Sequence, residues 1–134
     1  MPERQLRMTR PNLDDLPDYT LPDGYELRPY EPGDEAAWAE IMNTGIGEGW
    51  TVDLCKRTML EPEQFRPDGF LFITHEGKPV GSACAWTASP EERVSGQVHM
   101  VCIMPGHRGK RLGWIITLAV LHYMRNQGFT EAWL

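Results

Sequence analysis

Residues 101–114 read VCIMPGHRGKRLGW, and this stretch decides how the rest of the chain is interpreted. An apolar, strand-like run ends at Pro105-Gly106, and a long apolar helical pattern begins at Gly113. Between them lies a basic loop that contains Arg108, Gly109, Lys110 and Arg111. A helix leaves its first N–H groups without intrahelical partners, and its macrodipole adds positive charge there. The loop therefore predicts an anion site suited to phosphate or pyrophosphate. A basic surface loop with a glycine turn is the alternative interpretation of the same residues.

On the C-terminal side of this loop, residues 113–127 predict a buried helix. Apolar residues recur there at helical spacing and fill nearly the whole circumference. Arg125 suits the last turn, and Gly128 suits the position just after the helix. A final strand is expected to begin at 130–134, where the sequence stops.

On the N-terminal side, two strand-like runs joined by a short turn indicate a hairpin that precedes the strand of the basic loop. In the second run Gly81, Ala83 and Ala85 alternate with larger residues, so a helix or a ligand is expected close to that face. Asp34 and Thr51 are expected to cap two earlier helices. The expected elements upstream of the loop are a strand at 25–28, helices near 35–43 and 52–60, and strands at 69–74, 79–87 and 97–104.

The order β-α-α-β-β-β-α-β is an α/β pattern with a mixed α+β sheet, in one domain over residues 24–134. Residues 1–23 contain Pro2, Pro11, Pro17 and Pro22, which predicts an extended arm that lies on the domain.

Composition excludes several classes of function. Thirteen Lys and Arg against 19 Asp and Glu give a net charge of −6, which argues against nucleic-acid or anionic-membrane binding and mildly favours an amine-bearing ligand. No apolar run approaches a membrane span, and the first residues lack a secretory pattern, so we expect a cytoplasmic protein. The three cysteines and four histidines have no redox or metal-ligand spacing, so no metal is expected.

The run from Val101 to Trp114 resembles the acyl-CoA-binding motif of the GNAT superfamily of N-acetyltransferases. In that motif a strand is followed by Pro, an Arg/Gln-x-x-Gly-x-Gly/Ala loop and a helix. Arg108 fills the first loop position and Gly113 the last, whereas Arg111 stands where the middle glycine is usual. Either Arg111 restricts how closely the backbone meets the pyrophosphate, or its guanidinium contacts phosphate instead. The likeness extends over residues 25–134.

The resemblance implies a GNAT-like fold and direct transfer of an acetyl or other acyl group from acetyl-CoA, the co-substrate, to a primary amine of a small molecule or peptide. The pantetheine arm would bind the backbone of Val101, Cys102 and Ile103. The loop would hold the pyrophosphate through Arg108 and the amides of Gly109, Lys110, Arg111, Leu112, Gly113 and Trp114. The alternatives are a non-catalytic CoA-binding or regulatory domain, an inactive truncated form, and an anion-binding module unrelated to CoA.

Attack by an amine needs a base, and the strand before the loop offers one candidate. Strict alternation would put His99 on one face with Gln97, Val101 and Ile103, and His99 is the titratable member of that set. Within the superfamily that this chain resembles, arylalkylamine acetyltransferases carry histidine at the matching strand position, whereas other members use a nearby Glu or only ordered water. A packed core histidine is the other interpretation. Cys102 is expected to face away from His99 and to serve packing.

Two further expectations follow from the resemblance. Trp50, after the glycine-rich residues 45–49, is either an aromatic wall of the acceptor pocket or an anchor of the second helix. The family's domain normally continues with another helix and two strands, and often supplies a tyrosine as general acid. We therefore expect a C-terminally incomplete form, or a partner segment, as in a homo-oligomer, that covers the edge of the last strand.

Overall fold

The computed structural model describes residues 9–134, so the first eight residues of the predicted arm lie outside the described part. A six-stranded sheet has the order β1-β6-β5-β4-β3-β2, in which β5 and β6 are parallel and the other neighbours antiparallel. The strands are β1 (Thr9–Arg10), β2 (Tyr25–Pro29), β3 (Phe70–His75), β4 (Lys78–Trp86), β5 (Ser95–Ile103) and β6 (Glu131–Trp133). The helices are α1 (Glu35–Gly45), α2 (Val52–Cys55) and α3 (Leu112–Asn126).

Short helical turns complete the architecture. A π-helical turn over Lys56–Leu60 continues α2, and 3-10 turns occupy Pro67–Gly69 and Pro105–His107. The predicted α/β class and the order of the elements are confirmed, and β1 is an added strand that the sequence did not predict. Within residues 9–134, no helix has the length and apolar character needed to cross a bilayer.

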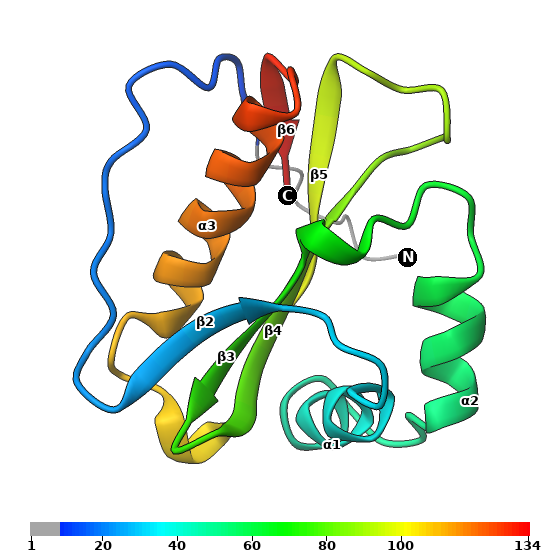
Figure 1. Ribbon diagram of the computed structural model, residues 1–134, viewed down its shortest axis with the longest axis vertical. Helices are drawn as coiled ribbons and strands as arrows, with labels where there is room; N and C mark the ends of the chain where they lie inside the picture. The colour runs from blue at the N-terminus through cyan, green and yellow to red at the C-terminus, as the bar shows by residue number, and fades with distance from the viewer. Residues whose placement is uncertain (1–8) are drawn as a thin grey trace, which may run out of the picture.

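The sheet lies between two layers of helix, with α3 on one face and α1 and α2 on the other (Figure 1). Ala83 and Ala85 of β4 belong to the core beneath α3, whereas Cys84 belongs to the core beneath α1 and α2. This confirms the prediction that a helix approaches the face of small side chains. Apolar burial on both faces is the main stabilising contribution.

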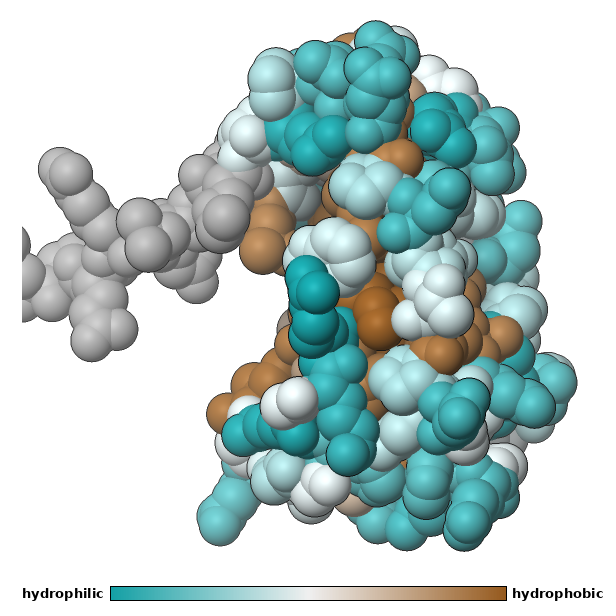
Figure 2. Space-filling model, turned by 90° about the vertical axis from the view of Figure 1, so that its left-hand side faces the viewer, coloured by the Kyte–Doolittle hydropathy of each residue, from teal (hydrophilic) through white to brown (hydrophobic). Residues whose placement is uncertain are grey.

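Residues 11–24 run along the outer side of α3 (Figure 1). Leu13 and Leu16 are buried in the core beneath that helix. The His122 Nε2 donates to the carbonyl of Pro17 at 2.9 Å, and the ring of Tyr19 lies edge-on to the His122 ring. Seen from this side, apolar atoms are visible in the middle of the face, between hydrophilic regions above and below (Figure 2).

The two predicted caps have different outcomes. The Thr51 hydroxyl accepts a hydrogen bond from the amide of Leu54 at 3.0 Å, which confirms it as the cap of α2. Asp34 precedes α1 as predicted, but its side chain makes no capping bond. Its carboxylate instead accepts two bonds from the Arg28 guanidinium, at 2.7 and 2.9 Å, because a bidentate ion pair is stronger than a cap.

A β-bulge in β5 corrects the predicted facing of its side chains. Ser82 pairs with Cys102, but Cys84 pairs with His99, so β5 carries one extra residue. Met100 absorbs it with a left-handed φ of 56°. His99 therefore stacks on Trp86, on the α1 and α2 side, whereas Val101 and Ile103 pack beneath α3. The expectation that His99 shares a face with Val101 and Ile103 was wrong, as was the expectation that Cys102 faces away from it: Cys102 packs on the side of His99.

Candidate active site

A groove of about 340 Å³ lies where β5 ends and α3 begins. It brings together all of the predicted acyl-CoA residues except Lys110 and Trp114, and adds Gly45, Ile46 and His107, which were not predicted to bind acyl-CoA. The lining residues are Gly45, Ile46, Val101, Cys102, Ile103, His107, Arg108, Gly109, Arg111, Leu112 and Gly113.

The loop backbone is shaped to present amides to the groove. Gly109 has a φ of 85° and Arg111 a φ of 63°, so the chain turns twice through the left-handed region before α3. The first intrahelical bond of α3 runs from the amide of Ile115 to the carbonyl of Arg111 at 3.0 Å. The amides of Leu112, Gly113 and Trp114 precede it and have no intrahelical acceptor. The start of α3 thus offers donors and the positive end of a helix dipole to an anion.

The edge of β5 at the groove is open. Strand β6 pairs with Ser95–Gln97 and, within residues 9–134, no strand lies beside β5 beyond that point on the same edge. The backbone of Val101–Ile103 can therefore pair with an extended ligand as an added strand would.

The loop carries positive charge without acidic partners. None of Arg108, Lys110 and Arg111 takes part in an ion pair within the described residues. The Arg108 Nε donates to the carbonyl of Ile103 at 3.1 Å, which ties the loop to the end of β5. The Arg111 guanidinium lies over the indole of Trp114, 4.7 Å from its centroid. In a chain of net charge −6, these side chains form a local concentration of positive charge that suits an anion.

The end of α1 forms the opposite wall of the groove. A Cβ at Gly45 would lie 2.1 Å from the Cys102 Sγ, so glycine is needed for this approach. The Cys102 thiol donates to the carbonyl of Ile41 at 3.5 Å, and burial raises its pKa despite the nearby Arg108. The thiol is therefore protonated at neutral pH. The glycine-rich break at 45–49 was the sequence signal for this wall.

His107 is a further groove residue that the sequence did not single out. Its Nδ1 lies 2.7 Å from the hydroxyl of Tyr25, and its ring centroid lies 5.1 Å from that of His75. Burial, the neighbouring His75 and two lysines, Lys110 and Lys78, lower its pKa. This cluster fixes the loop against β2 and β3.

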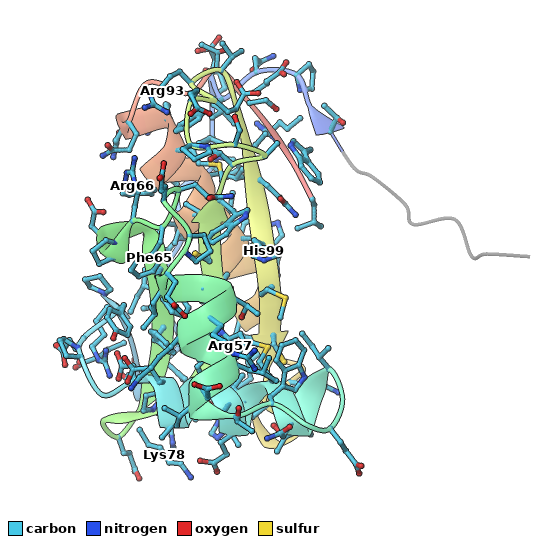
Figure 3. All side chains as sticks on the ribbon, turned by 90° about the vertical axis from the view of Figure 1, so that its right-hand side faces the viewer. Arg57, Phe65, Arg66, Lys78, Arg93 and His99 are labelled. Carbon is cyan, nitrogen blue, oxygen red and sulfur yellow. The ribbon has the colours of Figure 1, made fainter. Side chains whose placement is uncertain are left out.

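His99 lies upstream on β5 (Figure 3), and it does not line the groove. Its ring stacks on Trp86 at a centroid distance of 5.2 Å, and its Nδ1 lies 3.4 Å from the amide nitrogen of Gln97. Burial lowers its pKa, which keeps the imidazole neutral at pH 7 and able to accept a proton.

Trp50 lies apart from the groove. Its ring meets the buried Trp38 edge-on at 5.3 Å, and its amide and carbonyl both bond to the side chain of Asn43 at 2.9 Å. These contacts hold Trp50, which directly precedes the α2 cap Thr51, on the core beneath α1 and α2, in line with its interpretation as an anchor of the second helix.

Comparison with known proteins agrees with this architecture. The sequence model of the acetyltransferase (GNAT) family matches residues 34–134. A mycothiol acetyltransferase from Thermomonospora curvata is 32% identical over 136 residues, which cover 96% of this chain and 44% of that protein. One from Thermobispora bispora is 35% identical over 139 residues, with 96% and 46% covered. This chain thus spans less than half the length of these relatives.

Among solved structures, a GCN5-related N-acetyltransferase from Sphaerobacter thermophilus superposes with a TM-score of 0.81 at 21% identity, over 96% of this chain and 40% of that one. The fold, the groove and the sequence match lead to one assignment: the chain belongs to the acetyltransferase (GNAT) family.

Proposed function

We propose that this protein transfers an acetyl group from acetyl-CoA to an amine. The observation that carries the proposal is the groove itself. It combines the open edge of β5, a basic loop with left-handed backbone at Gly109 and Arg111, and the first amides of α3, which have no intrahelical acceptor. Coenzyme A has three parts that match these features: an extended pantetheine arm, a pyrophosphate and a nucleotide. The pantetheine arm would lie along Val101–Ile103, and the pyrophosphate would meet the amides from Gly109 to Trp114.

We further propose His99 as the general base. An amine attacks a thioester only after it has lost a proton, and the neutral imidazole of His99 can accept one. Because His99 does not line the groove, the proton would move through ordered water. Trp50 would contribute to the acceptor pocket indirectly, by anchoring the segment that follows α1, whose first residue, Ile46, lines the groove.

The acceptor is proposed from the relatives. The two relatives described above are both named mycothiol acetyltransferases, which makes a mycothiol-related amine the first acceptor to test. Simple primary amines and peptides with a free N-terminus are the other acceptors to test.

Binding is tested first, by thermal unfolding with increasing acetyl-CoA. A ligand present at 100 times its Kd adds about 2.7 kcal/mol to the stability of the folded state. Acetylpantetheine, which lacks the nucleotide, should stabilise the protein much less at equal concentration. No stabilisation by millimolar acetyl-CoA would contradict the proposal.

Turnover is tested by release of the CoA thiol with each amine. Release that depends on the amine supports transfer, whereas binding without release favours the non-catalytic CoA-binding alternative. If His99 is the base, the rate falls at acidic pH in the natural protein, and His99→Gln is slow throughout without that acidic limb. An unchanged profile in His99→Gln would make His99 a packed core histidine.

A further inference from the structure

Arg111 occupies a backbone conformation that favours glycine. Its φ of 63° and ψ of 20° lie in the left-handed region, at the loop position where the family motif usually has glycine. A side chain with a Cβ is disfavoured there, so Arg111 carries a local backbone cost that glycine would not.

The Arg111 side chain is held on an exposed aromatic ring. Its guanidinium lies 4.7 Å from the centroid of Trp114, and Trp114 keeps 45% of its surface exposed. Arg111 lines the groove, whereas Trp114 does not, so the pair reaches from the groove to the surface beside it. Within residues 9–134 the guanidinium has neither a carboxylate partner nor a hydrogen bond to a carbonyl. Its donors are therefore available to an external anion.

The position of Arg111 and Trp114 beside the groove favours contact with one particular phosphate of CoA. The pyrophosphate has the backbone amides inside the groove, and the part of CoA beyond the pyrophosphate is the adenosine with its 3′-phosphate. We propose that Arg111, positioned by Trp114, binds the 3′-phosphate and so makes the protein discriminate CoA from 3′-dephospho-CoA. This inference rests on the proposed function. The chemistry fits, because a planar guanidinium forms paired, charge-assisted bonds to phosphate oxygens.

The test compares the affinities of CoA and 3′-dephospho-CoA by titration calorimetry. We expect the natural protein to prefer CoA by about tenfold, the effect of one or two charge-assisted hydrogen bonds at an exposed site. Arg111→Gly should abolish the preference and yet raise the melting temperature of the ligand-free protein, because glycine fits the left-handed backbone. Trp114→Ala should reduce the preference to an intermediate value, because the charge remains but is no longer held in place.

Arg57→Gln is the matched control. It removes the same charge from the exposed turn that follows α2 (Figure 3), at a residue that does not line the groove, and should keep the full preference for CoA. Equal affinity of the natural protein for both ligands would overturn the inference, even if acetyl-CoA binds. An Arg111→Gly variant that loses affinity for both ligands equally would also overturn it, because Arg111 would then contact the pyrophosphate. Failure to bind either ligand would contradict the proposed function and this inference together.

Discussion

At the scale of single residues, Gly45 sets how closely α1 approaches β5. Because a Cβ there would lie 2.1 Å from the Cys102 Sγ, Gly45→Ala forces α1 and β5 apart. We expect a loss of about 1–3 kcal/mol in the free energy of unfolding, the usual cost of overpacking, measured by urea denaturation. Acetyl-CoA binding should weaken as well, since both residues line the groove.

Two variants control for this prediction. Gly47→Ala adds the same methyl group where nothing lies within 4 Å, so its stability should match the natural protein. Gly45→Ala combined with Cys102→Ala removes the clashing sulfur and should recover part of the loss, which a double-mutant cycle measures. A single Gly45→Ala variant as stable as the natural protein would show that the thiol moves aside freely.

His99 links stability to pH. Burial lowers its pKa in the folded state, so the unfolded chain takes up the proton first as the solution is acidified. Stability is therefore retained above the ordinary histidine pKa of about 6.5 and is lost as pH falls below it. The melting temperature of the natural protein should decrease from pH 7.5 to pH 5.5, and that of His99→Gln should decrease less. His107, whose pKa is also lowered, leaves a residual slope in the variant.

At the scale of elements, the ion pair between Arg28 and Asp34 joins β2 to the start of α1. Burial alone would raise the pKa of Asp34, but the bonds from Arg28 and from the Glu31 amide outweigh it and lower that pKa. Arg28→Ala leaves the carboxylate buried without its partner and should cost about 2–3 kcal/mol in urea denaturation.

Arg57→Ala is the comparison for the Arg28 variant. Its pair with Asp53 is exposed, with 62% and 77% of the two side chains accessible, and such pairs contribute about 0.3–0.5 kcal/mol.

The lowered pKa of Asp34 also predicts that stability is lost as pH falls through the acidic range below about 4. That loss should be smaller in Arg28→Ala, and equal costs for the two arginines would refute the stabilising role of the partly buried pair.

The order of the elements and the loop of the groove could be predicted from the sequence, because periodicity and turn residues are local signals. The facing of His99 could not. A bulge at Met100 reverses which face of the sheet the side chains of β5 point to, and nothing in the sequence around Met100 predicts a left-handed backbone there. Strand β1 was missed for a similar reason: two residues before Pro11 form a strand because β6, at the far end of the chain, pairs with them.

Arg111 and Gly45 show the same limit within the site. The letters indicated that Arg111 replaces a usual glycine, but not that its side chain rests on Trp114. They indicated a glycine-rich break at 45–49, but not that Cys102 occupies the space of the missing side chain. The first contact depends on the left-handed backbone of Arg111, and the second depends on the packing of two segments that are distant in sequence. Composition and periodicity report neither.

At the scale of the whole molecule, the core extends beyond the residues that the family model matches. Leu13 precedes the matched range 34–134, yet it is only 2% exposed and packs in the core beneath α3. The arm is therefore expected to unfold together with the sheet, as one cooperative unit.

Leu13→Ala tests this cooperativity. Removal of a buried leucine side chain should cost about 2–5 kcal/mol, and the whole domain should lose it. Tryptophan fluorescence, to which the buried Trp38 and four other tryptophans contribute, and far-UV circular dichroism should shift to lower urea concentrations together. Val94→Ala, at a residue that is 55% exposed, should leave both transitions in place. If Leu13→Ala leaves the fluorescence transition unchanged, the arm is a separate layer, and the core of the domain is complete without it.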